Sequence, residues 1–454
     1  MTVDTKPFYF LDLNSYFGYV KSFATLSRLF SESNKPYIPY RFAEKLFCHC
    51  VKRPFSAIDL SRADNSFDSI ISAGGYKAGV GVKTFVNSTT SYKDEKVAEF
   101  TKYAGTHNLG RYPIDELIYT IASLRNQRVL SDAAEYGIDI DKSFYHCLIR
   151  VENGFFIHEE PYPIVDINNI YPTDLSGNKI QTFTEPSGSM IPFSDGISFY
   201  KYNTAKNVLY KRFDFKVGKN TDIVHTIIDN DAFGRILSLI DKKAESHPMT
   251  LLNDSIIPDL SQAQLYNKPL IVLPLYSSKT DSDGKPIVAE KSGINQWNAG
   301  GRARSFGEAY IPIPSMLYKY FPDFFPFDEE GKPLPFTLKL PTEKIINVKI
   351  CQSGNKALMS DPNTDLLQWL FATIDGSFDN SKSRLNTNDI SQNKPYTYND
   401  LIRINKDSVA IFKEGPFSFS IKTMPLNSFE RFKSLIIDNG DKLQFEQLIS
   451  DDES

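Results

Sequence analysis

Residues 64–99 read DNSFDSIISAGGYKAGVGVKTFVNSTTSYKDEKVAE, and this stretch decides the fold expected for the first half of the chain. The apolar segment 67–71 and the alternating segment 80–86 predict two strands. The glycines at 74–75 predict the turn between them. The segment 94–103 returns to helical spacing after a Ser/Thr-rich loop and predicts a helix. A strand–turn–strand unit followed by a helix is therefore expected here.

The regions around this unit predict elements of both kinds. Apolar spacing predicts helices at 40–51, 114–129 and 232–246, and strands at 55–60 and within 144–215. The polar segment 246–268 contains prolines and is the predicted boundary, strands dominate from residue 269 onward, and the Ser/Asn-rich segment 377–398 predicts a long surface loop. We expect two domains: a mixed α/β domain over 1–250 and a mainly β domain over 265–454.

The composition indicates a folded protein. The chain has 454 residues, of which 41% are hydrophobic and 13% aromatic, and its formal net charge is −4. This apolar content excludes a disordered chain. No apolar run approaches the ~18–20 residues of a membrane span, no secretory signal is visible, and four cysteines are too few for a disulfide scaffold. We expect a reduced, cytoplasmic protein that contacts no membrane and whose basic patches are local.

Carboxylates and a lysine recur within the deciding stretch. Asp68 lies on the first predicted strand and Lys83 lies 15 positions later on the second. Hydrolysis of a phosphodiester uses carboxylates to hold Mg²⁺ and a cation near the attacking water or the scissile phosphate. Asp64 competes with Asp68 for the metal-binding role. Glu95 and Glu99 lie one turn apart on the predicted helix. The alternative interpretation is a solvated lysine and a charged helix face.

The phrases GVGVKTF at 79–85 and KVAEF at 96–100 resemble the catalytic segment of certain type II restriction endonucleases of the PD-(D/E)xK superfamily. One position departs from that pattern, because Gly81 stands where an acidic residue usually precedes the lysine by two. A glycine there leaves space beside Lys83 for a carboxylate from a neighbouring element. The resemblance implies that a helical glutamate takes the role.

The candidates for this missing acid are Glu99, Glu95 and, on the earlier helix, Glu44. The resemblance implies that Asp68 and one of these glutamates bind Mg²⁺. It also implies that Lys83 orients or activates the attacking water. Which glutamate acts stays open at this point.

Two polar loops in the second half carry residue types that read DNA. The first begins the segment KSGINQWNAGGRARSFGEAYIPIP at 291–314, and the second is CQSGNKALMSDPN at 351–363. Arginine pairs with guanine edges, asparagine and glutamine pair with adenine, and lysine commonly contacts phosphate. The candidate DNA-binding residues are Asn295, Gln296, Trp297, Asn298, Arg302, Arg304, Asn355, Lys356, Ser360 and Asn363. Trp297 is alternatively a core anchor.

Residues 269–373 resemble the B3-like DNA-recognition domain at the C-terminus of NgoFVII-type restriction endonucleases. The matching phrases are SGINQWNAGGRAR, EAYIPIP, FFP and NKALMSDPN. The resemblance implies a pseudobarrel with two arms that enter the major groove, at about 291–304 and 353–363. The best-known carriers of this module use a nuclease that needs His-x-Lys, and no histidine here has a lysine two positions on.

These observations predict a type II restriction endonuclease that hydrolyses double-stranded DNA with Mg²⁺. We expect a homodimer at least on DNA, because cutting both strands usually takes two active sites. One alternative is a catalytically inactive, sequence-specific DNA-binding protein in which Gly81 marks a true loss of the acid. A second alternative is a two-domain protein that binds no nucleic acid.

Overall fold

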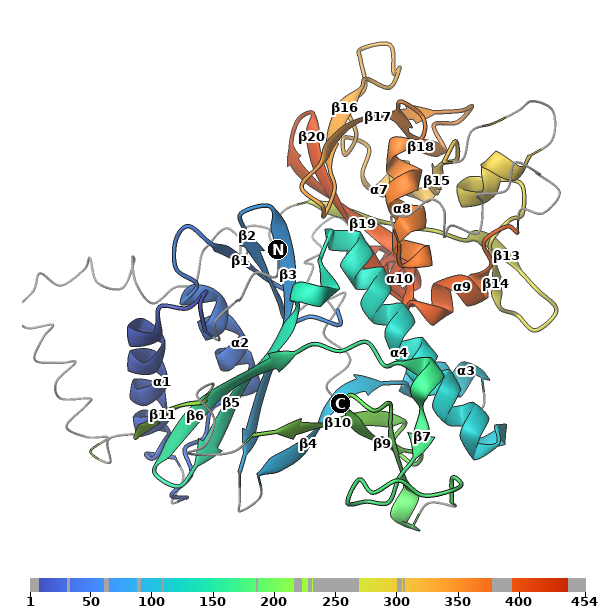
Figure 1. Ribbon diagram of the computed structural model, residues 1–454. Helices are drawn as coiled ribbons and strands as arrows, with labels where there is room; N and C mark the ends of the chain where they lie inside the picture. Colours follow the sequence, from blue (N-terminus) through green and yellow to red (C-terminus); the bar gives the residue numbers. More distant parts are fainter. Residues whose placement is uncertain are drawn as a thin grey trace, which may run out of the picture. The chain divides into compact units, whose positions relative to one another are not determined.

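The computed structural model describes residues 8–30, 33–60, 65–87, 91–107, 109–184, 187–215, 223–227, 231, 269–299, 304, 307–377 and 394–439. The chain divides into two compact units. Unit 1 comprises Met1–Asn126 with Ile138–Pro258, and unit 2 comprises Gln127–Gly137 with Asp259–Ser454. The fold is mixed α/β with several sheets, as the sequence predicts (Figure 1).

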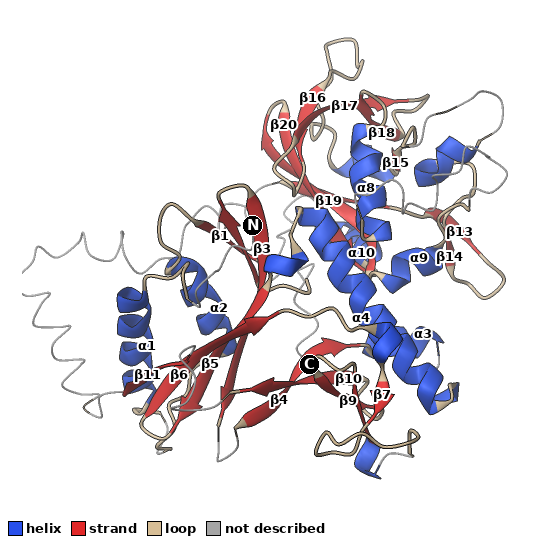
Figure 2. Ribbon diagram, in the orientation of Figure 1, coloured by secondary structure: helices blue, strands red, loops and turns tan. Residues whose placement is uncertain are grey.

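Unit 1 contains a six-stranded mixed sheet with the order β1-β2-β3-β5-β6-β11 (Figure 2). Its strands are β1 (Ser56–Asp59), β2 (Ser69–Ala73), β3 (Tyr76–Val86), β5 (Phe144–Val151), β6 (Gly154–Pro161) and β11 (Ile223–Ile227). Neighbouring strands are antiparallel except β3 and β5, which are parallel. A parallel pair needs a crossover, and this connection contains α3 (Thr101–His107) and α4 (Ile114–Tyr136).

Two helices, α1 (Leu13–Ser27) and α2 (Tyr40–His49), cover one face of this sheet. The helix expected at 40–51 is present as α2, and its buried Leu46 joins a core with Val20 of α1 and Val82 of β3. The apolar stripe of α2 therefore faces the sheet. Glu44, a buried polar residue of α2, is carried toward the sheet with this stripe.

A five-stranded sheet packs on the other face of the first sheet. Its order is β4-β10-β9-β8-β7, with β4 (Tyr92–Glu99), β10 (Val208–Asp214), β9 (Phe199–Asn203), β8 (Met190–Ser194) and β7 (Tyr171–Pro172). The ring of Phe213 on β10 lies 6.1 Å from that of Phe85 on β3 and 5.0 Å from that of Tyr145 on β5. The two sheets thus enclose the side of β3 on which Phe85 lies.

The helix predicted at 94–103 is wrong, because residues 92–99 form strand β4. Lys, Glu and Ala favour helices, which explains the prediction. The whole segment instead pairs with β10, and Asp94 binds Arg212 there at 3.0 Å. Only after Phe100 does the chain turn into a helix, α3. Pairing with a strand more than a hundred residues away overrides the local preference.

Unit 2 contains a seven-stranded sheet with the order β12-β19-β20-β16-β17-β18-β15. Its strands are β12 (Leu270–Pro274), β19 (Lys406–Gly415), β20 (Ser418–Pro425), β16 (Phe336–Lys339), β17 (Ile345–Cys351), β18 (Ala357–Asp361) and β15 (Ile311–Pro312). The edge strands β12 and β15 lie close to each other, so the sheet is nearly closed and barrel-like. A small second sheet pairs β13 (Ser277–Thr280) with β14 (Pro286–Ile287).

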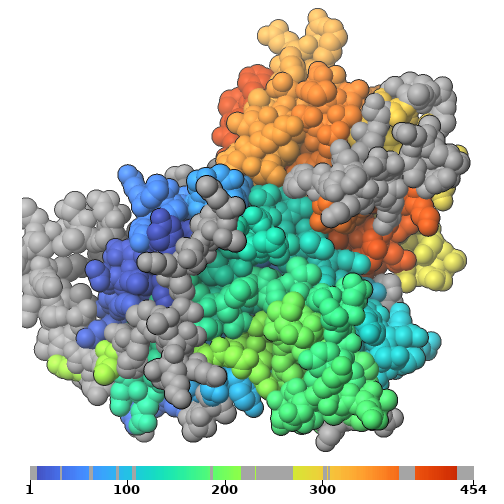
Figure 3. All heavy atoms as spheres, viewed as in Figure 1, coloured from blue at the N-terminus to red at the C-terminus, as the bar shows by residue number. Residues whose placement is uncertain are grey.

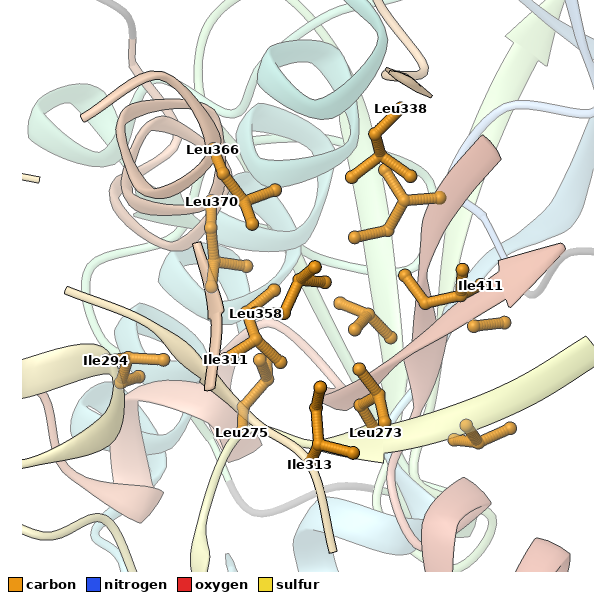
Figure 4. Packing of buried hydrophobic residues seen from close by; sticks show 14 of the residues in the cluster. Leu273, Leu275, Ile294, Ile311, Ile313, Leu338, Leu358, Leu366, Leu370 and Ile411 are labelled. Carbon is orange, nitrogen blue, oxygen red and sulfur yellow. The ribbon is translucent and has the colours of Figure 1, made fainter. Parts of the chain in front are cut away.

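The core of unit 2 lies between this sheet and its helices. These are α7 (Met316–Tyr320), α8 (Asp365–Asp375), α9 (Tyr398–Arg403) and α10 (Ser428–Asn439). Figure 4 shows Leu366 and Leu370 of α8 pointing toward Ile311 and Leu358 of the sheet. Short 3₁₀ helices are η1 (Leu109–Arg111), η2 (Ile140–Lys142), η3 (Ile167–Asn169), η4 (Ser187–Ser189) and η5 (Gly293–Asn298).

The last turns of α4 belong to unit 2 and are held there by buried charges. Lys406 Nζ on β19 lies 2.5 Å from Asp132 Oδ1 and also binds the carboxylate of Glu135. Glu135 Oε1 accepts a bond from the Thr423 N–H at 2.9 Å, and its carbonyl accepts one from the Trp369 indole at 3.1 Å. Buried charges are tolerated when they are paired and hydrogen-bonded in this way.

Several predicted segments lie outside the described residues. These are the helix at 232–246, the boundary segment 246–268 and most of the loop at 377–398. Within the described ranges, no helix has both the length and the apolar content needed to cross a membrane.

Candidate functional site

Asp68 and Lys83 lie side by side on the first sheet of unit 1. Asp68 immediately precedes β2, and its backbone N–H donates to the carbonyl of Val80 on β3 at 2.9 Å. Its Oδ2 accepts a bond from the Val82 N–H at 2.7 Å and lies 3.9 Å from Lys83 Nζ. The side chains of Asp68 and Lys83 are 24% and 26% exposed, so solvent can reach them. The structure thus brings together the two residues that the sequence analysis placed on neighbouring strands.

Burial and mutual attraction set the charges of this pair. Burial raises the pKa of the Asp68 carboxyl, while Lys83 and the Val82 N–H oppose the rise. Burial disfavours the charged form of Lys83, but the negative groups around it, Asp68 foremost, outweigh burial and raise the pKa of Lys83. Lys83 is therefore fully charged at neutral pH and can attract a phosphate oxygen.

Glu44 brings a second carboxyl from helix α2. It is 5% exposed, and its Oε2 has no hydrogen-bond partner in the described part of the chain. Burial, together with the charge of Asp68, raises the pKa of Glu44 to about 8, and Lys83 opposes that rise. A buried carboxyl with a raised pKa beside other charged groups is typical of functional sites. Glu44 is one of the three glutamates considered for the missing acid.

Asp59, at the end of β1, is a nearby carboxyl that the sequence analysis does not single out. It pairs through its backbone with Ser69, the residue after Asp68. Its charge contributes to the raised pKa values of Glu44 and Asp68. The only signal in the sequence is an acidic residue at the end of a short strand. The pairing of β1 with β2 is needed to place it at the site.

The two glutamates of β4 have different surroundings. Burial raises the pKa of Glu95, and nearby lysines, Lys83 among them, oppose the rise. Glu99 is half exposed, lies 3.1 Å from Lys96 Nζ and accepts a bond from the Thr101 hydroxyl at 2.9 Å. Of the two β4 carboxyls, Glu95 is therefore the one whose pKa is influenced by Lys83. Glu99 instead binds Lys96 and Thr101 at the end of the strand. The expectation that the two share a helix face is wrong, because both lie on β4.

The space beside Gly81 is filled by aromatic rings. A Cβ added at Gly81 would lie 2.7 Å from ring atoms of Tyr145 and 3.1 Å from the ring of Tyr162. These rings stack with centroids 4.2 Å apart. The prediction that glycine leaves room for a carboxylate beside Lys83 is therefore wrong. The glycine is required by the close approach of Tyr145, and any replacement acid must reach the site from another direction.

Replacing Gly81 with alanine should lower the free energy of unfolding by about 1–3 kcal/mol, because the new methyl group overlaps the Tyr145 ring. Urea unfolding followed by circular dichroism would measure this. Gly18→Ala is the matched control, since Gly18 lies inside α1 with no atom within 4 Å of an added Cβ. That control should be up to about 1 kcal/mol more stable than the wild type. A Gly81→Ala protein as stable as the wild type would refute this account of Gly81.

The donor set of the site suits a hard divalent cation. Within the described ranges, no three or more His, Cys, Asp and Glu side chains form a group able to hold a metal ion. Mg²⁺ in phosphoryl-transfer sites usually takes one or two protein carboxylates, with water and substrate phosphate as further ligands. Asp68 and the buried, unpaired Oε2 of Glu44 fit that smaller donor set. Asp64, the other metal candidate, lies outside the described residues.

Six of the predicted DNA-binding residues are at least partly exposed in the described loops of unit 2. These are Gln296, Asn298, Arg304, Asn355, Lys356 and Asn363. Nη1 of Arg304 donates to the carbonyl of Gln296 at 2.7 Å, which ties the far part of the first loop to η5. Arg302 lies outside the described residues.

Three other predicted DNA contacts are buried, and their assignment is corrected. The amide of Asn295 donates to the Tyr396 carbonyl at 2.8 Å and accepts from the Tyr396 N–H at 2.9 Å. Trp297 packs in the core of unit 2. Ser360 is fully buried, and its hydroxyl accepts a bond from the Leu366 N–H at 3.0 Å. These side chains hold the loops in place and do not present polar atoms to a base edge.

Unit 1 therefore offers oxygen ligands for a cation next to a charged ammonium group, in a place that solvent reaches. This combination suits metal-assisted hydrolysis of a phosphate ester. Unit 2 offers polar and basic side chains on two neighbouring loops. Neither a protein-family model nor a curated protein matches the sequence.

Proposed function

We propose that this chain is a Mg²⁺-dependent, site-specific DNA endonuclease of the type II restriction class. The proposal rests on the partly exposed Asp68–Lys83 pair and on the buried carboxyl of Glu44, whose pKa both residues influence and whose Oε2 is unpaired within the described residues. A mixed sheet with flanking helices is compatible with a PD-(D/E)xK-like nuclease. The barrel-like sheet of unit 2 is compatible with a B3-like pseudobarrel.

In the proposed mechanism, Asp68 and Glu44 hold the metal ion, with Glu95 as the alternative second carboxylate. Bound Mg²⁺ supplies Lewis-acid polarisation of the phosphoryl oxygen and favours ionisation of water. The Val82 N–H fixes the orientation of the Asp68 carboxylate, which in turn holds the ammonium group of Lys83. Lys83 then orients the attacking water or stabilises the negative charge that develops on the phosphorus oxygens.

In the same proposal, the loops of unit 2 recognise the DNA. Lys356 is exposed and suits a phosphate contact, whereas Arg302 and Arg304 suit guanine edges or phosphates. Asn298 and Asn363 are available for polar contacts with bases. Cleaving both strands usually takes two active sites, so the proposal includes a homodimer on DNA.

A second candidate function is a sequence-specific DNA-binding protein without nuclease activity. The observation that favours it is the packing of Tyr145 against Gly81, which excludes an acid at the usual position. If neither Glu44 nor Glu95 supplies that acid, the site lacks a ligand for the metal.

Incubating the full chain with phage DNA, in Mg²⁺ or in EDTA, tests the proposal. We expect discrete bands on a gel with Mg²⁺ and intact DNA with EDTA. EDTA removes the metal ion that the proposed mechanism needs to polarise the phosphate and to activate the attacking water. Intact DNA in both lanes, with a retarded band in a binding assay, would favour the inactive DNA-binding protein. Several phage genomes that differ in sequence and methylation serve as substrates, so that a missing site does not decide the result.

A further inference from the structure

Unit 2 contains a cavity of about 400 Å³ that the mechanism above does not use. It lies between β12, the β13–β14 sheet, the start of η5, the β15 segment and α10. This volume is in the range of sites that hold small organic ligands. The turn at residues 328–332, closed by a bond from the Asp328 N–H to the Lys332 carbonyl at 2.9 Å, does not line the cavity. Figure 3 shows the surface of the second half of the chain in yellow to red.

The inner wall of the cavity is aromatic and aliphatic. Tyr276 and Phe429 are each 7% exposed and pack edge to face, with ring centroids 6.5 Å apart. Ile294 is 1% exposed, and Ile313 is 3% exposed. Both also belong to the core of unit 2 (Figure 4). Such walls favour a flat, weakly polar ring that packs against them.

The mouth of the cavity is charged. Lys356 is exposed and lines it, and so do Lys433 and Glu430 of α10. Lys433 Nζ lies 3.4 Å from Glu430 Oε2, and both side chains are about half exposed, at 45% and 52%. The ammonium groups complement a phosphate, and the carboxylate can accept N–H bonds from a polar ring edge. An apolar interior below a rim of two lysines and one glutamate matches the chemistry of a nucleotide.

The cavity also connects the two loops expected to reach DNA. The Tyr310 N–H donates to the Gly293 carbonyl in the first loop at 3.2 Å. The Ile313 N–H donates to the Lys356 carbonyl in the second loop at 2.9 Å. All four residues line the cavity. Both loops therefore contribute residues to the cavity wall, so a duplex held by both would pass close to the cavity.

We propose that this cavity receives one nucleobase turned out of a bound DNA duplex, with Lys356 and Lys433 holding its flanking phosphate. This inference rests on the proposed function and extends it to recognition of a single extruded base. Unstacking a base costs a few kcal/mol, and proteins offset this by packing the base between apolar and aromatic side chains. The base in the cavity would add to specificity beyond the contacts of the two loops.

The test uses full-length Lys83→Ala protein and duplexes that it selects from a random-sequence pool. 2-Aminopurine, whose fluorescence rises when it is unstacked, replaces each base of the selected site in turn. We expect a several-fold rise at one position. Adding Ser278→Trp to the Lys83→Ala protein should abolish that rise, because the indole would fill the space that the base needs. Ser278 is exposed on β13 and lines the cavity but belongs to neither loop.

Lys332→Trp is the matched control, because Lys332 is exposed in the turn at 328–332 and does not line the cavity. It should leave the fluorescence rise intact. Duplex binding without a rise at any position overturns this inference and leaves the nuclease proposal standing. A rise that survives Ser278→Trp overturns it too, because the base then lies elsewhere. Failure of both the Lys83→Ala protein and the wild type in EDTA to bind any duplex overturns both proposals.

Discussion

Replacing Lys83 with alanine should reduce Mg²⁺-dependent DNA cleavage at least about 100-fold while DNA binding stays within a few-fold of wild type. The reason is that Lys83 lies 3.9 Å from Asp68 and, in the proposed mechanism, acts on the phosphate or the attacking water. Losing one such preorganised electrostatic contact typically costs about 10²–10³ in rate. Single-turnover cleavage, together with a binding assay on the same duplex, measures both quantities.

The control for this experiment is Lys206→Ala. Lys206 is an exposed residue in the turn between β9 and β10, and the same change there should leave cleavage unaltered. Circular dichroism of both variants checks that the fold persists. If Lys83→Ala cleaves DNA normally, the catalytic assignment fails. If it instead loses DNA binding and keeps its fold, Lys83 is a DNA contact and the mechanism must be revised.

The parts of the site that the sequence predicts are those set by local pattern. Alternation over 80–86 identifies the strand that carries Lys83, and the preceding apolar run places Asp68 beside it. Helical spacing over 40–51 identifies α2, which carries Glu44. These elements depend mainly on neighbours along the chain, so a pattern of a few residues is enough to find them.

The parts that the sequence does not predict depend on distant partners. Strand β4 has the composition of a helix, and its strand partner, β10, lies more than a hundred residues along the chain. The polar side chain of Asn295 suggests a surface contact, yet its amide is matched to the backbone of Tyr396, 101 residues away. The space at Gly81 is filled by Tyr145 from β5. No local pattern contains such information.

Glu44 should make the metal-free protein less stable as the pH rises from about 5 to about 8. Its pKa is about 8 in the folded state, against an ordinary value of 4.5. Between these values the folded state binds a proton that the unfolded state has released, so the free energy of unfolding falls with increasing pH. Glu44→Gln cannot ionise and should lack this fall. The free energy of unfolding of Glu44→Gln minus that of the wild type should therefore increase between pH 5 and pH 8, by at most about 5 kcal/mol.

Added Mg²⁺ should act on the wild type in the opposite direction. A cation bound by the ionised carboxyl of Glu44 stabilises the folded state, so Mg²⁺ at pH 8 should restore stability to the wild type and have little effect on Glu44→Gln. Urea unfolding at several pH values, with Mg²⁺ or with EDTA, measures these differences.

Glu152→Gln, at an exposed position on unit 1, is the control and should follow the wild type. If the wild type and Glu44→Gln show parallel pH profiles in EDTA, the carboxyl of Glu44 does not have the raised pKa inferred here. If they diverge in EDTA but respond equally to Mg²⁺, the metal ion is held without Glu44, and Glu95 is the next carboxylate to replace.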